Sequence, residues 1–167
     1  IGHRGLNNAN ENCYESSLST VFGEIKAGYG VEIDLQLSLD SCPTVFRDEI
    51  LDRMTSQSGS ISQLPGKELK QNLADRKDKI MQLSTLFSHV SPRAKLLIEL
   101  KDQSGSLVPT TGILERAVTQ ALEGYEGPVA VVFFSPATLK AMARRQNPKN
   151  FTNCVVLTIM MRFKHPF

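Results

Sequence analysis

The stretch VEIDLQ, residues 31–36, constrains the fold more than any other part of the sequence, because apolar and polar residues alternate strictly along it. Successive side chains of a β-strand point to opposite faces, so this stretch predicts a strand with one apolar and one charged face. Glu32 and Asp34 share the charged face, about 7 Å apart along the strand. The sequence therefore predicts a strand that lies between a hydrophobic layer and a polar space.

Strand-like and helix-like segments alternate along the chain. A short apolar segment at 1–5 ends at a glycine, and further strands are expected at 30–38, 43–46, 95–100, 128–134 and 154–159. Helical spacing of apolar residues predicts helices at 15–27, 67–73, 83–90, 109–122 and 136–145, whereas 56–66 is expected to be loop. Strands separated by helices of this length indicate βαβ units and a parallel sheet.

The phase of the alternation favours a closed barrel over an open sheet. In the segment 95–101, Glu99 and Lys101 again share one face. Strands with helices on their apolar side and charges on the other face a polar cavity, which is the arrangement of an α/β protein with the TIM (β/α)8 barrel fold. Such a barrel takes about 250 residues. We therefore expect 1–167 to be one domain with about five of the eight strands, lacking the C-terminal part of the barrel, and an oligomer that covers the open edges is possible.

Glu32, Asp34 and Glu99 are the candidate metal ligands. Three carboxylates in a half-buried cavity repel each other by several kcal/mol, so a cation is needed there. A set of oxygen ligands suits Mg²⁺ or Ca²⁺. The alternative from the residues alone is an edge strand with a solvated acidic face.

The N-terminal sequence IGHRG places His3 and Arg4 at the end of the first expected strand, and Glu11 follows soon after. A histidine at a strand end is a candidate for proton transfer, although a structural histidine is the alternative.

The composition excludes some classes of function. Nineteen basic and 17 acidic residues give a net charge of +2, without the clustered basic surface that nucleic-acid binding requires. No apolar stretch approaches the roughly 20 residues of a membrane span. Three widely spaced cysteines form no zinc motif and favour a reducing compartment, so a cytoplasmic location is expected, with a secreted or periplasmic one left open.

Five ordered motifs resemble those of the glycerophosphodiester phosphodiesterase family, from residue 1 to about residue 145. The family pattern is H-R-G, E-N-T, E-x-D, H-D-x-x-L-x-R-x-T and E-x-K. The matching segments are His3–Gly5, Glu11–Cys13, Glu32–Asp34, Arg47–Thr55 and Glu99–Lys101.

The resemblance implies a TIM-barrel phosphoric diester hydrolase of glycerophospholipid metabolism. Its small-molecule substrates are glycerophosphodiesters, which it hydrolyses to glycerol phosphate and an alcohol. By resemblance, Mg²⁺ or Ca²⁺ lies on Glu32, Asp34 and Glu99, with Glu11 beside the metal and the phosphate. His3 is one of two histidines that act as general acid and base. Arg4 and Lys101 bind the phosphate.

Arg47 departs from the family pattern, because it stands where the second catalytic histidine is expected. The guanidinium group keeps its proton at neutral pH, so it cannot act as a general acid or base, although it can bind a phosphate. The alternative function is therefore a catalytically impaired family member that binds a phosphoester as a sensor or scaffold.

Overall fold

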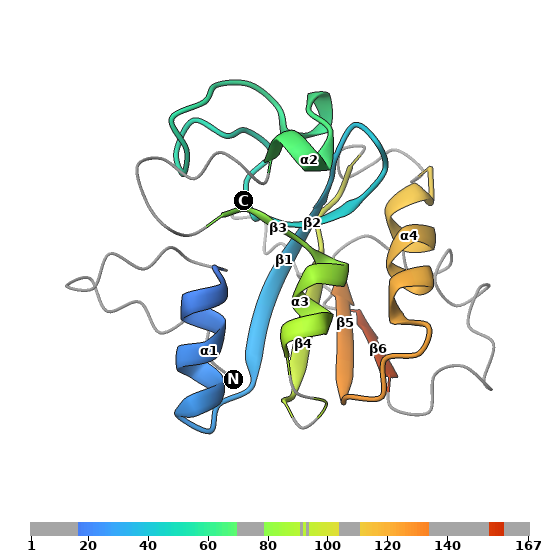
Figure 1. Cartoon of the computed structure of the whole chain (residues 1–167). Coiled ribbons are helices and arrows are strands. Elements are labelled where there is room, and N and C mark those ends of the chain that lie inside the picture. The colour runs from blue at the N-terminus through green and yellow to red at the C-terminus, as the bar shows by residue number, and fades with distance from the viewer. Residues whose placement is uncertain are drawn as a thin grey trace, which may run out of the picture.

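A computed structural model gives the structure of residues 17–69, 79–90, 92, 94–103 and 111–133, and the backbone of Cys154–Thr158. Its strands are β1 (Val31–Leu37), β2 (Pro43–Val45), β3 (Met81–Gln82), β4 (Leu96–Leu100), β5 (Val129–Phe133) and β6 (Cys154–Thr158). They form one sheet in the order β3-β2-β1-β4-β5-β6 (Figure 1). The expected strand at 1–5 lies outside the described residues.

The predicted parallel pairing is confirmed for β1, β4, β5 and β6. In contrast, β2 runs antiparallel to β1, with Leu35 opposite Val45. Only residues 38–42 join these two strands, which is enough for a hairpin but too short for the crossover that a parallel pair needs. The sequence analysis assigned no strand to β3, which is only two residues long and pairs antiparallel with β2.

The helices are α1 (Leu18–Lys26), α2 (Gly66–Leu69), α3 (Leu83–His89) and α4 (Ile113–Leu122), with a 3₁₀ turn, η1, at Ile61–Gln63. The predicted loop at 56–66 was therefore wrong at η1. Helix α4 begins later than predicted, because Gly112 before it has a left-handed φ of 71° and interrupts helical geometry. The helix expected at 136–145 lies outside the described residues.

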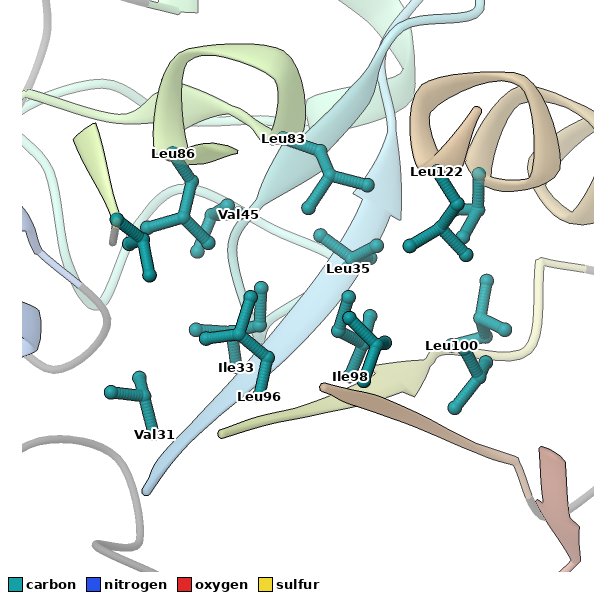
Figure 2. Packing of buried hydrophobic residues seen from close by; sticks show 14 of the residues in the cluster. Val31, Ile33, Leu35, Val45, Leu83, Leu86, Leu96, Ile98, Leu100 and Leu122 are labelled. Carbon is teal, nitrogen blue, oxygen red and sulfur yellow. The ribbon is translucent and has the colours of Figure 1, made fainter. Parts of the chain in front are cut away.

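The main hydrophobic core lies between the sheet and its helices. Figure 2 shows Ile33 and Leu35 of β1 beside Leu96 and Ile98 of β4, all of them buried. Helices α3 and α4 cover this face with Leu83, Leu86 and Leu122 (Figure 2). Because side chains alternate along β1, Glu32 and Asp34 lie on the face away from these helices.

A second, smaller core holds the segment that follows β2. Its buried residues are Phe46, Leu51, Ile61, Leu69 and Ile80, with Met54 and Leu64 packed against them. Figure 1 shows this segment and α2 at the end of the sheet where β1 finishes. It therefore lies beside the C-terminal ends of the parallel strands, where sites are built in barrels of this type. Among the described helices, none is long and apolar enough to cross a membrane.

Candidate active site

Strand register brings the predicted acidic residues together. Asp34 of β1 is the direct neighbour of Glu99 of β4, and Glu32 precedes Asp34 by two residues on the same face. Glu32 is 5% exposed and Asp34 is 2% exposed, so neither relies on bulk water for solvation. Buried carboxylates need a positive charge or strong hydrogen bonds nearby.

The geometry of these three carboxylates fits a divalent cation. One oxygen from each of Glu32, Asp34 and Glu99 lies within 4.8 Å of the others. Two ligands on opposite sides of a Ca²⁺ ion are separated by about 4.6–5.2 Å, since each lies about 2.3–2.6 Å from the metal. The three oxygens are therefore close enough to bind the same ion without moving the strands apart.

Lys101 supplies a positive charge to this cluster. Its Nζ lies 2.7 Å from Oδ1 of Asp34 and also contacts Oε1 of Glu99. Its backbone N–H donates to the carbonyl of Leu35 at 3.1 Å, which continues the pairing of β4 with β1. Burial by itself lowers the pKa of Lys101, but the hydrogen bonds and charges of Asp34 and Glu99 outweigh burial and raise it. The two carboxylates therefore favour the charged form of the ammonium group that lies beside them.

Arg47 lies at the edge of the same face. The N–H of Phe46 donates to the carbonyl of Asp34 at 3.0 Å, and Nε2 of Gln36 donates to the carbonyl of Arg47 at 3.0 Å. These bonds hold the backbone of residue 47 beside the end of β1. Asp48, in contrast, pairs with Arg53, with Oδ2 and Nε 2.5 Å apart. The chain thus brings residue 47 to the site, while the carboxylate of Asp48 is engaged in the adjoining loop.

A family model identifies the chain. The model of the glycerophosphoryl diester phosphodiesterase family matches residues 3–162. The chain belongs to this family. Among curated proteins, none matches.

Solved structures of the glycerophosphoryl diester phosphodiesterase type have the same fold. A Thermotoga maritima glycerophosphodiester phosphodiesterase is 26% identical, with a TM-score of 0.73 over 98% of this chain and 62% of its own. An Oleispira antarctica phosphodiesterase in complex with the product sn-glycerol-3-phosphate is 24% identical, with a TM-score of 0.75 over 95% and 63%. A phosphodiesterase domain from Mycobacterium tuberculosis is 18% identical, with a TM-score of 0.67 over 88% and 55%. The chain thus spans 55–63% of the length of these structures and contains part of their TIM barrel.

Three predicted site residues of this family member, His3, Arg4 and Glu11, lie outside the described residues. His89 is the last residue of α3, is exposed, and has Nδ1 2.8 Å from the carbonyl of Thr85. Helix α3 packs on the apolar face of the sheet, so His89 lies on the side opposite the carboxylates.

The sequence analysis missed two glutamines at the site. Gln103 donates to Oε1 of Gln36 at 2.8 Å, and its own Oε1 accepts from the N–H of Leu37 at 3.2 Å. Gln36 completes the polar face of VEIDLQ, and Gln103 follows Lys101 by two residues. The alternation that pointed to Glu32 and Asp34 therefore also contained the signal for Gln36.

Proposed function

We propose that this protein is a metal-dependent hydrolase of glycerophosphodiesters that releases sn-glycerol-3-phosphate and an alcohol. The observation that carries this proposal is the convergence of three carboxylate oxygens within 4.8 Å on the family's E-x-D and E-x-K segments. Family membership and the product named for the Oleispira structure support the same reaction class.

Glu32, Asp34 and Glu99 would hold Mg²⁺ or Ca²⁺, with Glu11 nearby. A cation held there would supply positive charge beside the phosphoryl oxygens and make the phosphorus centre more electrophilic. Lys101 and Arg4 would bind the phosphate, and the guanidinium of Arg47 can add a bidentate contact. Together these cations offset the charge that develops in the transition state.

His3 would transfer the proton. In the overall reaction an oxygen of water forms a bond to phosphorus, the bond from phosphorus to the alcohol oxygen breaks, and a proton passes to that alcohol. The water must lose a proton as it attacks, so an imidazole near neutral pKa is suited to accept it. Arg47 cannot share this role because it stays protonated.

Arg47 favours a second candidate function, in which the site binds a phosphoester with little turnover. Loss of one proton-transfer group typically lowers a rate by about 10² to 10⁴. The site would still bind a cation through its carboxylates and a phosphate through Lys101 and Arg47. The two candidates therefore share a ligand and differ in rate.

The test measures cation binding and product release separately. Mg²⁺ or Ca²⁺ should raise the melting temperature of the protein, since a ligand that binds only the folded state stabilises it. Glu32→Ala should abolish this rise, and Glu123→Gln, an exposed change at the end of α4, should preserve it. Release of sn-glycerol-3-phosphate from glycerophosphodiesters by wild type, lost in Glu32→Ala, supports the hydrolase. Cation binding without product supports the second candidate, and an equal rise in all three proteins contradicts the metal assignment.

A further inference from the structure

The hydrogen-bond ladder between β1 and β4 changes at Lys101. The N–H of Lys101 donates to the carbonyl of Leu35 at 3.1 Å, one residue beyond the end of β4. In a parallel ladder, the residue that makes such a bond also accepts at its own carbonyl from an N–H two residues further along the neighbouring strand, which here is that of Leu37. The N–H of Leu37 and the carbonyl of Lys101 bond instead to the side chain of Gln103.

The side-chain amide of Gln103 bridges the two strands at this point. Its Oε1 accepts from the N–H of Leu37 at 3.2 Å, and its Nε2 donates to the carbonyl of Lys101 at 3.0 Å. A side-chain amide carries the same kinds of donor and acceptor as a peptide group, so it can join two strands where their backbones separate. The backbone of Lys101 is thus held at both of its polar groups, the N–H by Leu35 and the carbonyl by Gln103.

A second amide fixes the orientation of the first. Nε2 of Gln103 also donates to Oε1 of Gln36 at 2.8 Å, and Nε2 of Gln36 donates to the carbonyl of Arg47 at 3.0 Å. Gln36 is 6% exposed, whereas Gln103 is exposed. An amide has two N–H groups and one oxygen, and the three contacts of Gln103 use all of them. The bridge is therefore anchored on its buried side by Gln36.

This bridge holds the backbone that carries the ammonium group of Lys101. The lysine side chain is long and flexible, so the place that its ammonium group can reach depends on where its backbone is fixed. The carboxylates that contact this ammonium group, Asp34 and Glu99, lie opposite each other within the regular part of the ladder. Their positions depend on the paired strands, whereas the position of Lys101 also depends on Gln103.

We propose that Gln103 is a positioning residue of the site, which holds the backbone of Lys101 so that its ammonium group meets the phosphate of the substrate. Gln103 acts through Lys101 and not by contact with the ligand, and Gln36 keeps its amide in place. This inference rests on the proposed function, because the phosphate contact of Lys101 belongs to that function. Loss of the bridge should therefore weaken binding of a phosphate and leave binding of a cation by the carboxylates unchanged.

The test is Gln103→Leu, which removes the amide and keeps a side chain of similar size. Calorimetry measures the affinity of each protein for Ca²⁺, and then for sn-glycerol-3-phosphate in saturating Ca²⁺. We expect Gln103→Leu to bind sn-glycerol-3-phosphate about tenfold more weakly than wild type, with Ca²⁺ affinity within about twofold, as loss of one or two neutral hydrogen bonds allows. Gln120→Leu, which replaces an exposed glutamine of α4, is the matched control and should bind both ligands like wild type.

A double-mutant cycle tests whether Gln103 acts through Lys101. Lys101→Met should weaken binding of sn-glycerol-3-phosphate by itself, and adding Gln103→Leu should weaken it no further. If the two losses multiply in the double variant, Gln103 acts independently of Lys101 and the inference is overturned.

The outcomes separate this inference from the proposed function. Equal affinity of wild type and Gln103→Leu for sn-glycerol-3-phosphate overturns the positioning role and leaves the phosphodiesterase assignment standing. A parallel loss of Ca²⁺ affinity and phosphate affinity in Gln103→Leu also overturns it, because the glutamine then supports the sheet in general. If wild type binds no sn-glycerol-3-phosphate in Ca²⁺, the proposed function fails and the inference fails with it. Because Gln103 is exposed, its variant should fold, and its melting temperature checks this.

Discussion

Lys101 acts as the counter-ion of the carboxylate cluster. Its Nζ contacts Asp34 and Glu99, and its side chain is 22% exposed, whereas that of Asp34 is 3% exposed. The lysine therefore neutralises part of the buried charge of these carboxylates. The resemblance assigned Lys101 to the phosphate, and the structure places its ammonium group among the carboxylates. A cation bound by the same carboxylates would take over their neutralisation and leave Lys101 available to a phosphate.

Lys101→Met should distinguish the contribution of the lysine from that of a bound cation. Without a metal, the variant should lose about 2 kcal/mol in free energy of unfolding, less than the cost of breaking a fully buried pair because Lys101 is partly exposed. Ca²⁺ should then stabilise the variant more than it stabilises wild type, since Asp34 and Glu99 no longer pair with Lys101. Melting curves with and without Ca²⁺ measure both effects.

Lys95→Met is the matched control, because Lys95 lies just before the same strand and is exposed. Its melting temperature and Ca²⁺ response should remain close to those of wild type. A Ca²⁺ response of the same size in Lys101→Met and wild type would contradict competition between the lysine and a metal.

Arg47→His tests whether a missing proton carrier limits turnover. The backbone of residue 47 is held beside β1 through Asp34 and Gln36, so an imidazole at this position would lie at the edge of the carboxylate face. We expect hydrolysis of glycerophosphodiesters to increase by about 10²-fold, the lower end of what one general acid or base contributes. Release of sn-glycerol-3-phosphate measures the rate.

Arg47→Lys keeps the charge at residue 47 without an imidazole and should show no such increase. If Arg47→His and Arg47→Lys hydrolyse at the same rate, a lack of proton transfer at residue 47 does not limit the reaction.

At the scale of single elements, α1 shows how a glycine ends a helix. The helix begins after Ser17, whose Oγ accepts from the N–H of Thr20, and it ends before Gly28, which has a φ of 79°. A residue with a Cβ is strained in this left-handed conformation, whereas glycine adopts it freely. Gly23 lies within the same helix, and a Cβ added at either glycine meets no atom within 4 Å.

The two glycines should respond to alanine in opposite directions. Gly28→Ala should lower the free energy of unfolding by about 1 kcal/mol, because only its backbone conformation resists the change. Gly23→Ala should raise the free energy of unfolding by up to about 1 kcal/mol, since alanine favours a helix interior. Urea unfolding of both variants measures the difference. A loss of stability in both would show that contacts, and not backbone conformation, dominate at these positions.

Long, two-faced elements were predictable from the sequence, and short ones were not. The alternation in β1 predicted which of its side chains face the helices. A strand turned the other way would bury its charged residues against the helices. The two-residue β3 and the turn η1 have no periodicity to detect. They form because buried residues such as Ile61 and Met81 pack against distant parts of the chain.

The same limit applies to the candidate site. The phases of β1 and β4 pointed Glu32, Asp34 and Glu99 to one side, and the structure brings them together. The pairing of Asp34 with Glu99, and the contacts of Lys101 with both, depend on strand register. Register is set by pairing between segments more than 60 residues apart, which a local pattern does not contain. The bond between Gln36 and Gln103 was missed for the same reason.

At the scale of the whole molecule, two hydrophobic cores stabilise different parts of the protein. The main core holds the sheet that carries the carboxylates, and the second core holds the segment after β2, which includes Leu51 and Ile61. They meet at the end of β2, where Val45 belongs to the main core and the next residue, Phe46, belongs to the second. The carboxylate cluster therefore rests on the main core, while the segment after β2 rests on the second core.

Matched substitutions in the two cores should destabilise different parts of the structure. Ile98 and Leu51 are both fully buried, at 0% exposure. Alanine at either position should therefore lower the free energy of unfolding by about 3 kcal/mol for the part of the structure that packs on that residue. Ile98→Ala should speed amide hydrogen exchange throughout the sheet and lower the melting temperature. Leu51→Ala should speed exchange mainly at amides bonded within the segment after β2, such as those of Thr55 and Ile61. Since the carboxylates rest on the main core, Leu51→Ala should also keep the Ca²⁺ response. Equal exchange at all amides in Leu51→Ala would show one cooperative unit, in which the segment after β2 cannot open without unfolding the sheet that carries the carboxylates.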